Sequence, residues 1–131
     1  MTKLEVQRDQ FKKALSKLEE VLNEPKSEIV RDSAIKRFEF SLDIAWKAVK
    51  SYLEEVHGVV SNSPKEVFRE AYKQGLIDYD EKWLEMIDDR NEIVHMYKEE
   101  LAEELYGKLK GYLQLFKELF VKLSQIDSSS N

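Results

Sequence analysis

Apolar residues recur at alternating intervals of three and four along nearly all of this chain, which is the spacing of one face of an α-helix. The pattern stops only at short segments, most of which contain proline or glycine, residues that terminate helices. No segment keeps the strict apolar–polar alternation of a half-buried strand. The sequence therefore predicts an all-α fold.

Helix-terminating residues divide the chain into five predicted helices. Pro25 ends the first, and Gly58 and Gly75 end the second and third. Ser63 and Glu66 predict a capping box at the start of the third helix, with a proline in its preferred first position. The predicted ranges are 2–24, 29–57, 64–75, 80–95 and 99–125.

The lengths of these helices and their short connections predict one domain over residues 1–126, an antiparallel up-and-down four-helix bundle with an additional short helix. The apolar stripes are wider than the two-position seam of a coiled coil, which argues against that alternative. A chain of 131 residues buries roughly two-thirds of its unfolded surface, enough for a core without covalent cross-links. Residues 127–131 have no apolar side and are predicted to form a disordered tail.

Composition excludes several classes of protein. The chain has no cysteine, which excludes disulfides and thiolate metal sites and fits a reducing cytoplasm. It shows neither a signal peptide nor a run of the ~20 apolar residues that cross a membrane, so we expect a cytoplasmic protein. The net charge is −5, whereas general nucleic-acid binders are basic, so any action on RNA requires a local cationic site.

One short segment groups side chains that could carry chemistry. His95 is preceded by Arg90 and Asn91 and followed by Tyr97. Cleavage of RNA without a metal requires a group that moves protons and positive charge at the phosphorus. Histidine titrates near neutrality, and arginine grips a phosphate through two N–H groups. Arg90 and His95 are therefore the catalytic candidates, with Asn91 in support and no metal or cofactor expected.

The same residues also have a purely structural interpretation. On a straight helix, Arg90 and His95 point in directions about 140° apart. A shared site would need the reach of the arginine, a loosened helix or a second copy of the chain. Arg90 could instead pair with Asp88 or Asp89, and His95 could be an ordinary helix-end residue. The residues alone leave both interpretations open.

Two carboxylates on the second predicted helix are further supporting candidates. Glu39 and Asp43 lie one turn apart near the edge of the apolar stripe, where a carboxylate could orient Arg90 or His95 from a neighbouring helix. The alternative is pairing with a lysine of the same helix. The other histidine, His57, lies at a helix end, where interaction with the helix dipole explains it.

Several segments resemble, in combination, a known family. They are residues 31–47 (RDSAIKRFEFSLDIAWK), 63–66, 75–77 and 83–91, followed by His95 and Tyr97. The combination resembles the nucleotidyltransferase substrate-binding protein family, a HepT-like branch of the HEPN superfamily, over nearly the whole chain.

The resemblance implies properties that the residues alone do not give. Members of the family are antiparallel helical bundles that dimerise and form a complex with a minimal nucleotidyltransferase. HEPN proteins with an Arg-x4-6-His motif are commonly metal-independent ribonucleases, often toxins. In related pairs the motif reads Arg-x4-His-x-Tyr, and the nucleotidyltransferase inactivates the toxin by adding AMP to the tyrosine. The matching positions here are Arg90, His95 and Tyr97.

Two functions are compatible with this sequence. In the first, the protein is an endoribonuclease toxin that its partner neutralises by adding AMP to Tyr97. In the second, it is a non-catalytic subunit that binds a substrate or nucleotide for the nucleotidyltransferase. In both we expect a homodimer, a nucleotidyltransferase partner and RNA or a nucleotide as ligand, without a membrane.

Overall fold

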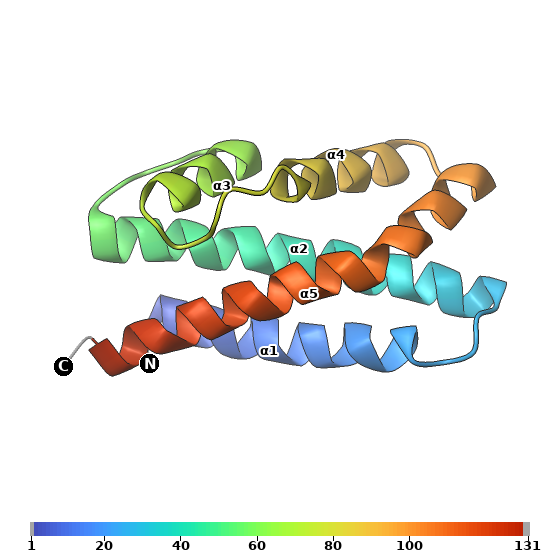
Figure 1. Cartoon of the computed structure of the whole chain (residues 1–131), viewed down its shortest axis with the longest axis horizontal. Coiled ribbons are helices and arrows are strands. Elements are labelled where there is room, and N and C mark those ends of the chain that lie inside the picture. Colours follow the sequence, from blue (N-terminus) through green and yellow to red (C-terminus); the bar gives the residue numbers. More distant parts are fainter. Residues whose placement is uncertain (1, 130–131) are drawn as a thin grey trace.

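The computed structural model describes residues 2–129, and within them every regular element is an α-helix (Figure 1). This confirms the predicted all-α class. The five helices are α1 (Lys3–Leu22), α2 (Glu28–His57), α3 (Pro64–Lys73), α4 (Lys82–His95) and α5 (Glu99–Ser129).

The helices form an up-and-down bundle in which α2 contacts all four others. α1, α2 and α5 are the long members, and the two shorter helices α3 and α4 follow one another along one side of α2 (Figure 1). Together α3 and α4 occupy the fourth position of the bundle, which accounts for the additional short helix in the prediction.

Polar caps and left-handed glycines fix the helix ends. Ser63 Oγ accepts a hydrogen bond from the backbone N–H of Glu66 at 3.4 Å, one of the two bonds of the predicted capping box. Gly58 and Gly75 have positive φ values of 66° and 78° and end α2 and α3 where the sequence predicts. Any other residue would be strained at these two positions.

The start of α4 and its buried side differ from the prediction in detail. Asp80 Oδ1 accepts the backbone N–H of Lys82 at 2.9 Å, so Asp80 caps the helix from two residues before its first residue. The apolar period places Val94 inside, but its side chain is 55% exposed, and the buried residue is Ile93. The last turn of α4 is covered by the start of α5, and Ile93 is the residue that faces Leu101 there.

The last helix extends beyond its predicted range. It continues to Ser129, past the predicted end at Gln125. Residues 130 and 131 of the predicted tail lie outside the described residues.

Aromatic side chains connect the helices through the core. Phe116 of α5 lies 5.9 Å from Phe11 of α1, 6.2 Å from Phe38 of α2 and 6.0 Å from Trp83 of α4, measured between ring centroids. Trp83 in turn stacks on Phe68 of α3 at 4.7 Å. A single cluster of rings therefore includes one residue from every helix, with Phe116 at its centre and fully buried.

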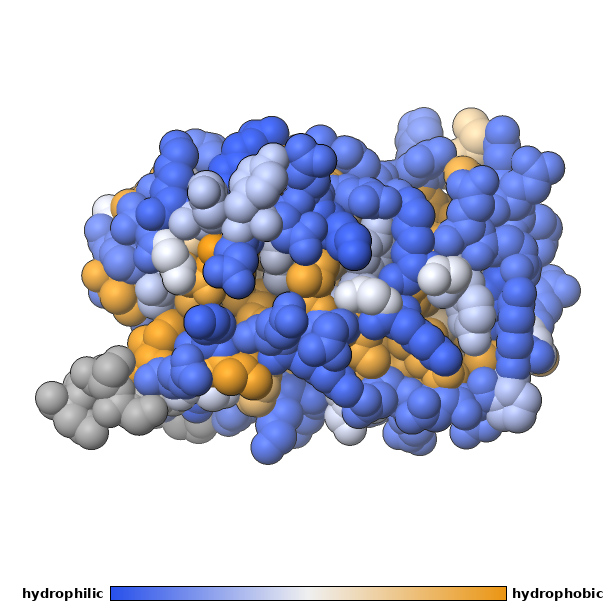
Figure 2. All heavy atoms as spheres, in the orientation of Figure 1, coloured by the Kyte–Doolittle hydropathy of each residue, from blue (hydrophilic) through white to orange (hydrophobic). Residues whose placement is uncertain are grey.

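Most of the surface seen in Figure 2 is polar. On the face seen in Figure 2, apolar atoms gather between α5 and the connection from α3 to α4, in a hollow lined by Ile77, Tyr79 and Leu115. Within residues 2–129, no helix is both long and apolar enough to cross a membrane.

We predict that Phe116→Ala lowers the free energy of unfolding by about 3–5 kcal/mol, because it leaves a cavity at the point where four helices meet. Urea denaturation followed by circular dichroism measures the change. Val121→Ala on the same helix is the matched control, because that side chain is 52% exposed. If both variants unfold at the same urea concentration, Phe116 does not hold the bundle together.

Candidate functional site

The motif residues lie at one end of the bundle, on the last turns of α4 and in the connection that follows. Arg90, Asn91 and His95 belong to α4, and Tyr97 lies in the three-residue connection to α5. Asn91, His95 and Tyr97 are exposed, and Arg90 is half-buried. One short segment of the chain therefore carries all four motif residues at or near the surface.

Arg90 forms no ion pair with any residue that the structure describes. Its Nη1 donates to the neighbouring Asn91 Oδ1, at 3.2 Å. The two carboxylates that could have paired with it are taken, since Asp88 pairs with Lys65 at 2.6 Å and Asp89 accepts from Tyr112 at 2.5 Å. Among the described residues, the Arg90 guanidinium thus has no carboxylate partner and remains able to bind an anion.

Helix α4 stays regular up to His95. The backbone N–H of Met96 still donates to the carbonyl of Glu92, at 2.9 Å, and Met96 is the first residue after the helix, with an extended backbone. Arg90 and His95 therefore project about 140° apart, and a loosened helix does not bring them together.

His95 lines a shallow pocket whose charged residues are mostly acidic. Glu92, Glu100 and Glu104 line it, against the single cation Lys98. Three carboxylates repel a phosphate, so this pocket needs additional positive charge before it can hold RNA. Arg90 of the same chain points to the other side of the helix.

Tyr97 makes the contact that sequence analysis did not anticipate. Its hydroxyl donates a hydrogen bond to Asp32 Oδ1 on the first turns of α2. Partial burial, followed by this hydrogen bond, raises the pKa of Tyr97 above its usual value. The same hydrogen bond, together with Arg31, lowers the pKa of Asp32. The hydroxyl therefore stays protonated and faces an ionised acceptor.

Arg31 holds this region together. Its side chain is only 4% exposed and forms ion pairs with Asp32 at 3.0 Å, Glu99 at 2.8 Å and Glu103 at 3.0 Å. These contacts raise the pKa of the guanidinium, the Glu103 hydrogen bond most of all. Because Arg31 joins the start of α2 to the start of α5, it anchors the connection that carries Tyr97.

A signal for Arg31 is present in the sequence. Arg31 precedes Ile35 and Phe38 at the same spacing of four and three that defines the apolar stripe of α2. A charged residue at a stripe position predicts a buried ion pair. Glu99 and Glu103, one turn apart on the last predicted helix, are acidic partners of the right spacing.

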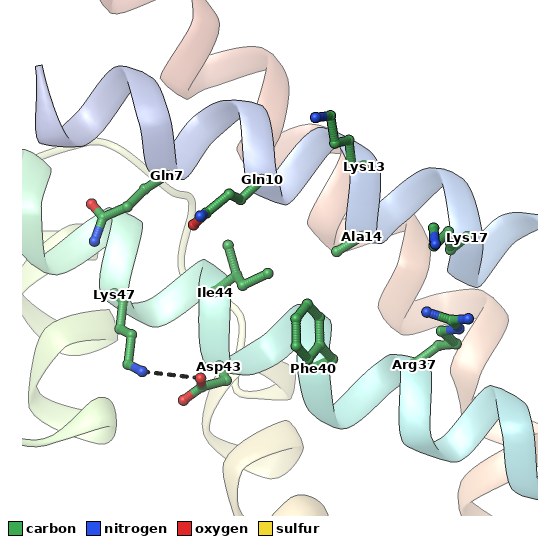
Figure 3. Close-up of a pocket in the computed structure, with 10 residues that line it drawn as sticks. All are labelled: Gln7, Gln10, Lys13, Ala14, Lys17, Arg37, Phe40, Asp43, Ile44 and Lys47. Carbon is green, nitrogen blue, oxygen red and sulfur yellow. Dashed lines mark hydrogen bonds and ion pairs between the residues drawn. The ribbon is translucent and has the colours of Figure 1, made fainter. Parts of the chain in front are cut away.

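Among the described residues, neither predicted supporting carboxylate forms a hydrogen bond or an ion pair with a residue of the motif. Asp43 accepts from Trp46 Nε1 at 3.3 Å and pairs with Lys47 at 3.1 Å, which is the intrahelical alternative (Figure 3). Glu39 is half-buried and makes neither a hydrogen bond nor an ion pair with any described residue. Asp32, rather than Glu39 or Asp43, is the carboxylate that α2 brings to the motif.

The second histidine has a structural role. His57 Nε2 lies 2.9 Å from the Tyr52 hydroxyl at the end of α2. Among the described residues, no group of three or more His, Cys, Asp or Glu side chains is arranged to hold a metal ion.

Solved structures share this fold. A crystal structure of a protein from Thermus thermophilus is 39% identical, with a TM-score of 0.81, and the match covers 86% of this chain and 98% of that one. A Haemophilus influenzae structure, described as revealing the fold of a substrate binding domain of a nucleotidyltransferase, is 24% identical with a TM-score of 0.75. That match covers 89% of this chain and 98% of the other. The protein thus has the helical-bundle fold of that domain.

The family model described as "Nucleotidyltransferase substrate binding protein like" matches residues 7–125, and the chain belongs to this family. A relative from Haemophilus influenzae named "Probable ribonuclease HepT" is 31% identical over 93 residues, which are 65% of this chain. The match spans 64% of that relative's length. The family name implies association with a nucleotidyltransferase.

We predict that Arg31→Met reduces the loss of stability in acid. The pKa values of Asp32 and Glu103 are lowered in the folded chain, by Tyr97 and Lys26 first and by Arg31 in both cases. Each carboxylate therefore stabilises the fold above its unfolded pKa, about 3.9 or 4.3, and loses that contribution as the pH falls through its folded value. The free energy of unfolding, measured in urea from about pH 6 to about pH 2, should fall less steeply in the variant.

The same variant should be less stable than the wild type at neutral pH, because it leaves three carboxylates without their shared cation. Lys73→Met is the matched control, since Lys73 is 69% exposed and its ion pair with Glu70 is 3.9 Å long. Parallel stability–pH curves for the wild type and Arg31→Met would show that the ion pairs of Arg31 do not contribute.

Proposed function

We propose that this protein is the HEPN-type partner of a minimal nucleotidyltransferase and acts as a metal-independent endoribonuclease toxin, neutralised by AMP addition to Tyr97. The observation that carries the proposal is that the motif side chains are accessible and are not taken up by structural ion pairs. Arg90 has no carboxylate partner among the described residues, His95 is exposed, and Tyr97 lies in the same surface segment. Similarity to a protein named as a probable ribonuclease supports the same function.

In the proposed reaction His95 moves protons and Arg90 holds the phosphate. His95 takes the proton from the 2′-hydroxyl, whose oxygen forms the new bond to phosphorus, and the bond to the 5′-oxygen breaks. The leaving 5′-oxygen takes a proton from a water molecule, and the product strand ends in a 2′,3′-cyclic phosphate. Arg90 stabilises the additional charge on the phosphoryl oxygens, and Asn91, which accepts from Arg90, positions its guanidinium.

A second copy of the chain brings an Arg90 close to a His95, which a single chain does not do. Within one chain, Arg90 and His95 project to different sides of α4, and the pocket beside His95 is lined mostly by carboxylates. Exposed apolar side chains, Val94 at 55% and Met96 at 49%, flank the histidine and provide surface for an interface. In a two-fold dimer through this surface, Arg90 of each copy faces His95 of the other.

The proposed modification uses the hydroxyl that Asp32 already contacts. Tyr97 Oη attacks the α-phosphorus of ATP, the bond to the β-phosphate oxygen breaks and pyrophosphate leaves. The phenol proton passes to Asp32, its hydrogen-bond acceptor. The product carries an anionic nucleotide two residues from His95, where it blocks the approach of an RNA phosphate.

The second candidate function is a non-catalytic subunit that binds a substrate or nucleotide for the nucleotidyltransferase. The acidic pocket beside His95 disfavours RNA cleavage by a single chain, because its carboxylates repel the phosphates of RNA, and a binding role of Arg90 does not require a phosphate in that pocket. Under this function Arg90 and His95 contact a ligand without bond cleavage.

We predict that His95→Ala lowers the rate of RNA cleavage by about 10²–10⁴-fold, because a proton-transfer group is lost. Arg90→Lys should also be inactive, since an ammonium cannot grip two phosphate oxygens. Cleavage of labelled single-stranded RNA in the presence of EDTA is the measurement, and His57→Ala is the control histidine. Mixing the Arg90→Lys and His95→Ala chains should restore part of the activity, because one of the two composite sites is then intact.

Two results would contradict this prediction. Equal cleavage by the wild type and His95→Ala removes the ribonuclease function and leaves the binding subunit. Failure of the mixed chains to recover activity, when light scattering gives only the 15.5 kDa species, removes the dimeric site.

We predict that Tyr97→Phe prevents neutralisation while keeping cleavage, because the change removes only the acceptor oxygen. Wild type incubated with ATP and its nucleotidyltransferase should gain the mass of AMP and lose activity, whereas Tyr97→Phe should do neither. Intact-protein mass spectrometry and the same cleavage assay are the readouts. Tyr79→Phe, which removes another exposed hydroxyl, is the control and should be modified like the wild type. AMP on the Tyr97→Phe variant would assign the modification to another residue.

A further inference from the structure

A groove between α1 and α2 lies apart from all the motif residues (Figure 3). Its volume is about 480 Å³, within the range of sites that hold a small ligand or one unit of a polymer. None of Arg90, Asn91, His95, Tyr97 or Asp32 lines it.

Positive charge gathers at one end of this groove. Lys13 and Lys17 on α1 and Arg37 on α2 line it, and none of the three pairs with a carboxylate of the described chain. Asp43, the acidic residue of the groove, is already bound to Lys47 at 3.1 Å. In a chain of net charge −5, three uncompensated cations in one groove form the kind of local cationic site that an anion requires.

An exposed aromatic ring lies among these cations. Phe40 is 61% exposed, on the wall of the groove, and the small side chain of Ala14 leaves open space opposite it (Figure 3). The ring takes no part in the core cluster, so folding does not account for it. An exposed ring flanked by cations is the arrangement on which proteins stack the bases of a single strand.

Amide groups line the other end. Gln7 and Gln10 project from α1 toward the groove (Figure 3). Gln7 Oε1 is buried without a hydrogen-bond donor, so its amide has unused bonding capacity. Amides offer both a donor and an acceptor, which suits the edge of a base.

We propose that this groove binds single-stranded RNA, with a base stacked on Phe40 and consecutive phosphates held by Lys13, Lys17 and Arg37. Lys13 and Lys17 are one helical turn apart, about 6 Å along the axis, which suits neighbouring phosphates of one strand. This proposal adds a substrate-binding site to the proposed ribonuclease, and it rests on that proposed function, because RNA is chosen as the polyanion for that reason. The groove docks the strand away from the bond that is cut.

A second copy of the chain is a poorer occupant. In a two-fold interface whose axis passes near the cationic end of the groove, Lys13, Lys17 and Arg37 would lie close to the same cations of the other copy, and like charges would repel. A polyanion neutralises all three at once.

Fluorescence anisotropy of a labelled RNA 12-mer, titrated with protein, tests the proposal. The measurements are made in the His95→Ala background, so that the strand is not cut. Lys13→Gln with Lys17→Gln should weaken binding and reduce the slope of log affinity against log salt by about 0.7 for each lysine. Phe40→Ala should weaken binding about tenfold with little change in that slope.

Matched controls come from the same helices. Lys12→Gln removes an exposed cation of α1 outside the groove, and Ile29→Ala removes an exposed apolar side chain of α2. Both should bind RNA like the parent. Equal binding by the groove variants, or no RNA binding by the parent, overturns the proposal.

Further measurements test whether the groove binds something other than RNA, and whether the groove proposal fails independently of the ribonuclease function. If ATP binds in a groove-dependent manner while RNA does not, the groove is a free-nucleotide site and the proposal is wrong. It is also wrong if the groove variants lose only their association with the nucleotidyltransferase. Cleavage by the wild type is measured separately. If the wild type cleaves RNA but the groove variants bind RNA as tightly as the parent, only the groove proposal is wrong. If RNA binding depends on the groove but the wild type does not cleave RNA, only the ribonuclease function is wrong.

Discussion

The ring contacts of Phe116 set the arrangement on which the rest of the molecule depends. Each helix carries one apolar stripe, and such helices gain most of their stability from packing rather than from their own hydrogen bonds. Phe116 touches rings of α1, α2 and α4, and Trp83 extends the contact to α3. Because close-packed rings tolerate little displacement, this cluster fixes how α5 crosses α2. The position where the start of α5 meets the start of α2 follows from that crossing.

Where the starts of α2 and α5 meet, the buried Arg31 holds the two helices together and so positions the exposed segment that carries Tyr97. Arg31 could not be buried without partners, since an unpaired buried charge is costly. Its carboxylates come from its own neighbour Asp32 and from α5, so burial of Arg31 requires the start of α5 to stay in place. The connection between α4 and α5 is thereby held short and close, and the Tyr97 hydroxyl meets Asp32. The chemistry proposed for this segment depends on a contact made by residues 65 positions apart.

Local features of the fold were predictable because their causes are local. The left-handed glycines at 58 and 75 and the Ser63 cap are specified within a few residues of chain, and the structure has them at these positions. The exposure of Val94 was not predictable, since the period of α4 places it inside and only the position of α5 leaves it uncovered. For Asp43, the sequence allowed either an ion pair with a lysine of the same helix or a contact with Arg90 or His95 on a neighbouring helix. Only the arrangement of the helices in the structure shows that Asp43 pairs with Lys47.

The sequence by itself determined the all-α class, the number of helices and the residues of the motif, because periodicity, caps and residue type act along the chain. Tertiary structure alone decided which groups meet. It brought Asp32 to Tyr97 and placed Lys13, Lys17 and Arg37 in one groove with Phe40. Within residues 2–129, it left Arg90 and these three cations without a carboxylate partner. The physical reason is that these contacts join residues on different helices, and their distances are set by how the core rings pack rather than by spacing in the sequence.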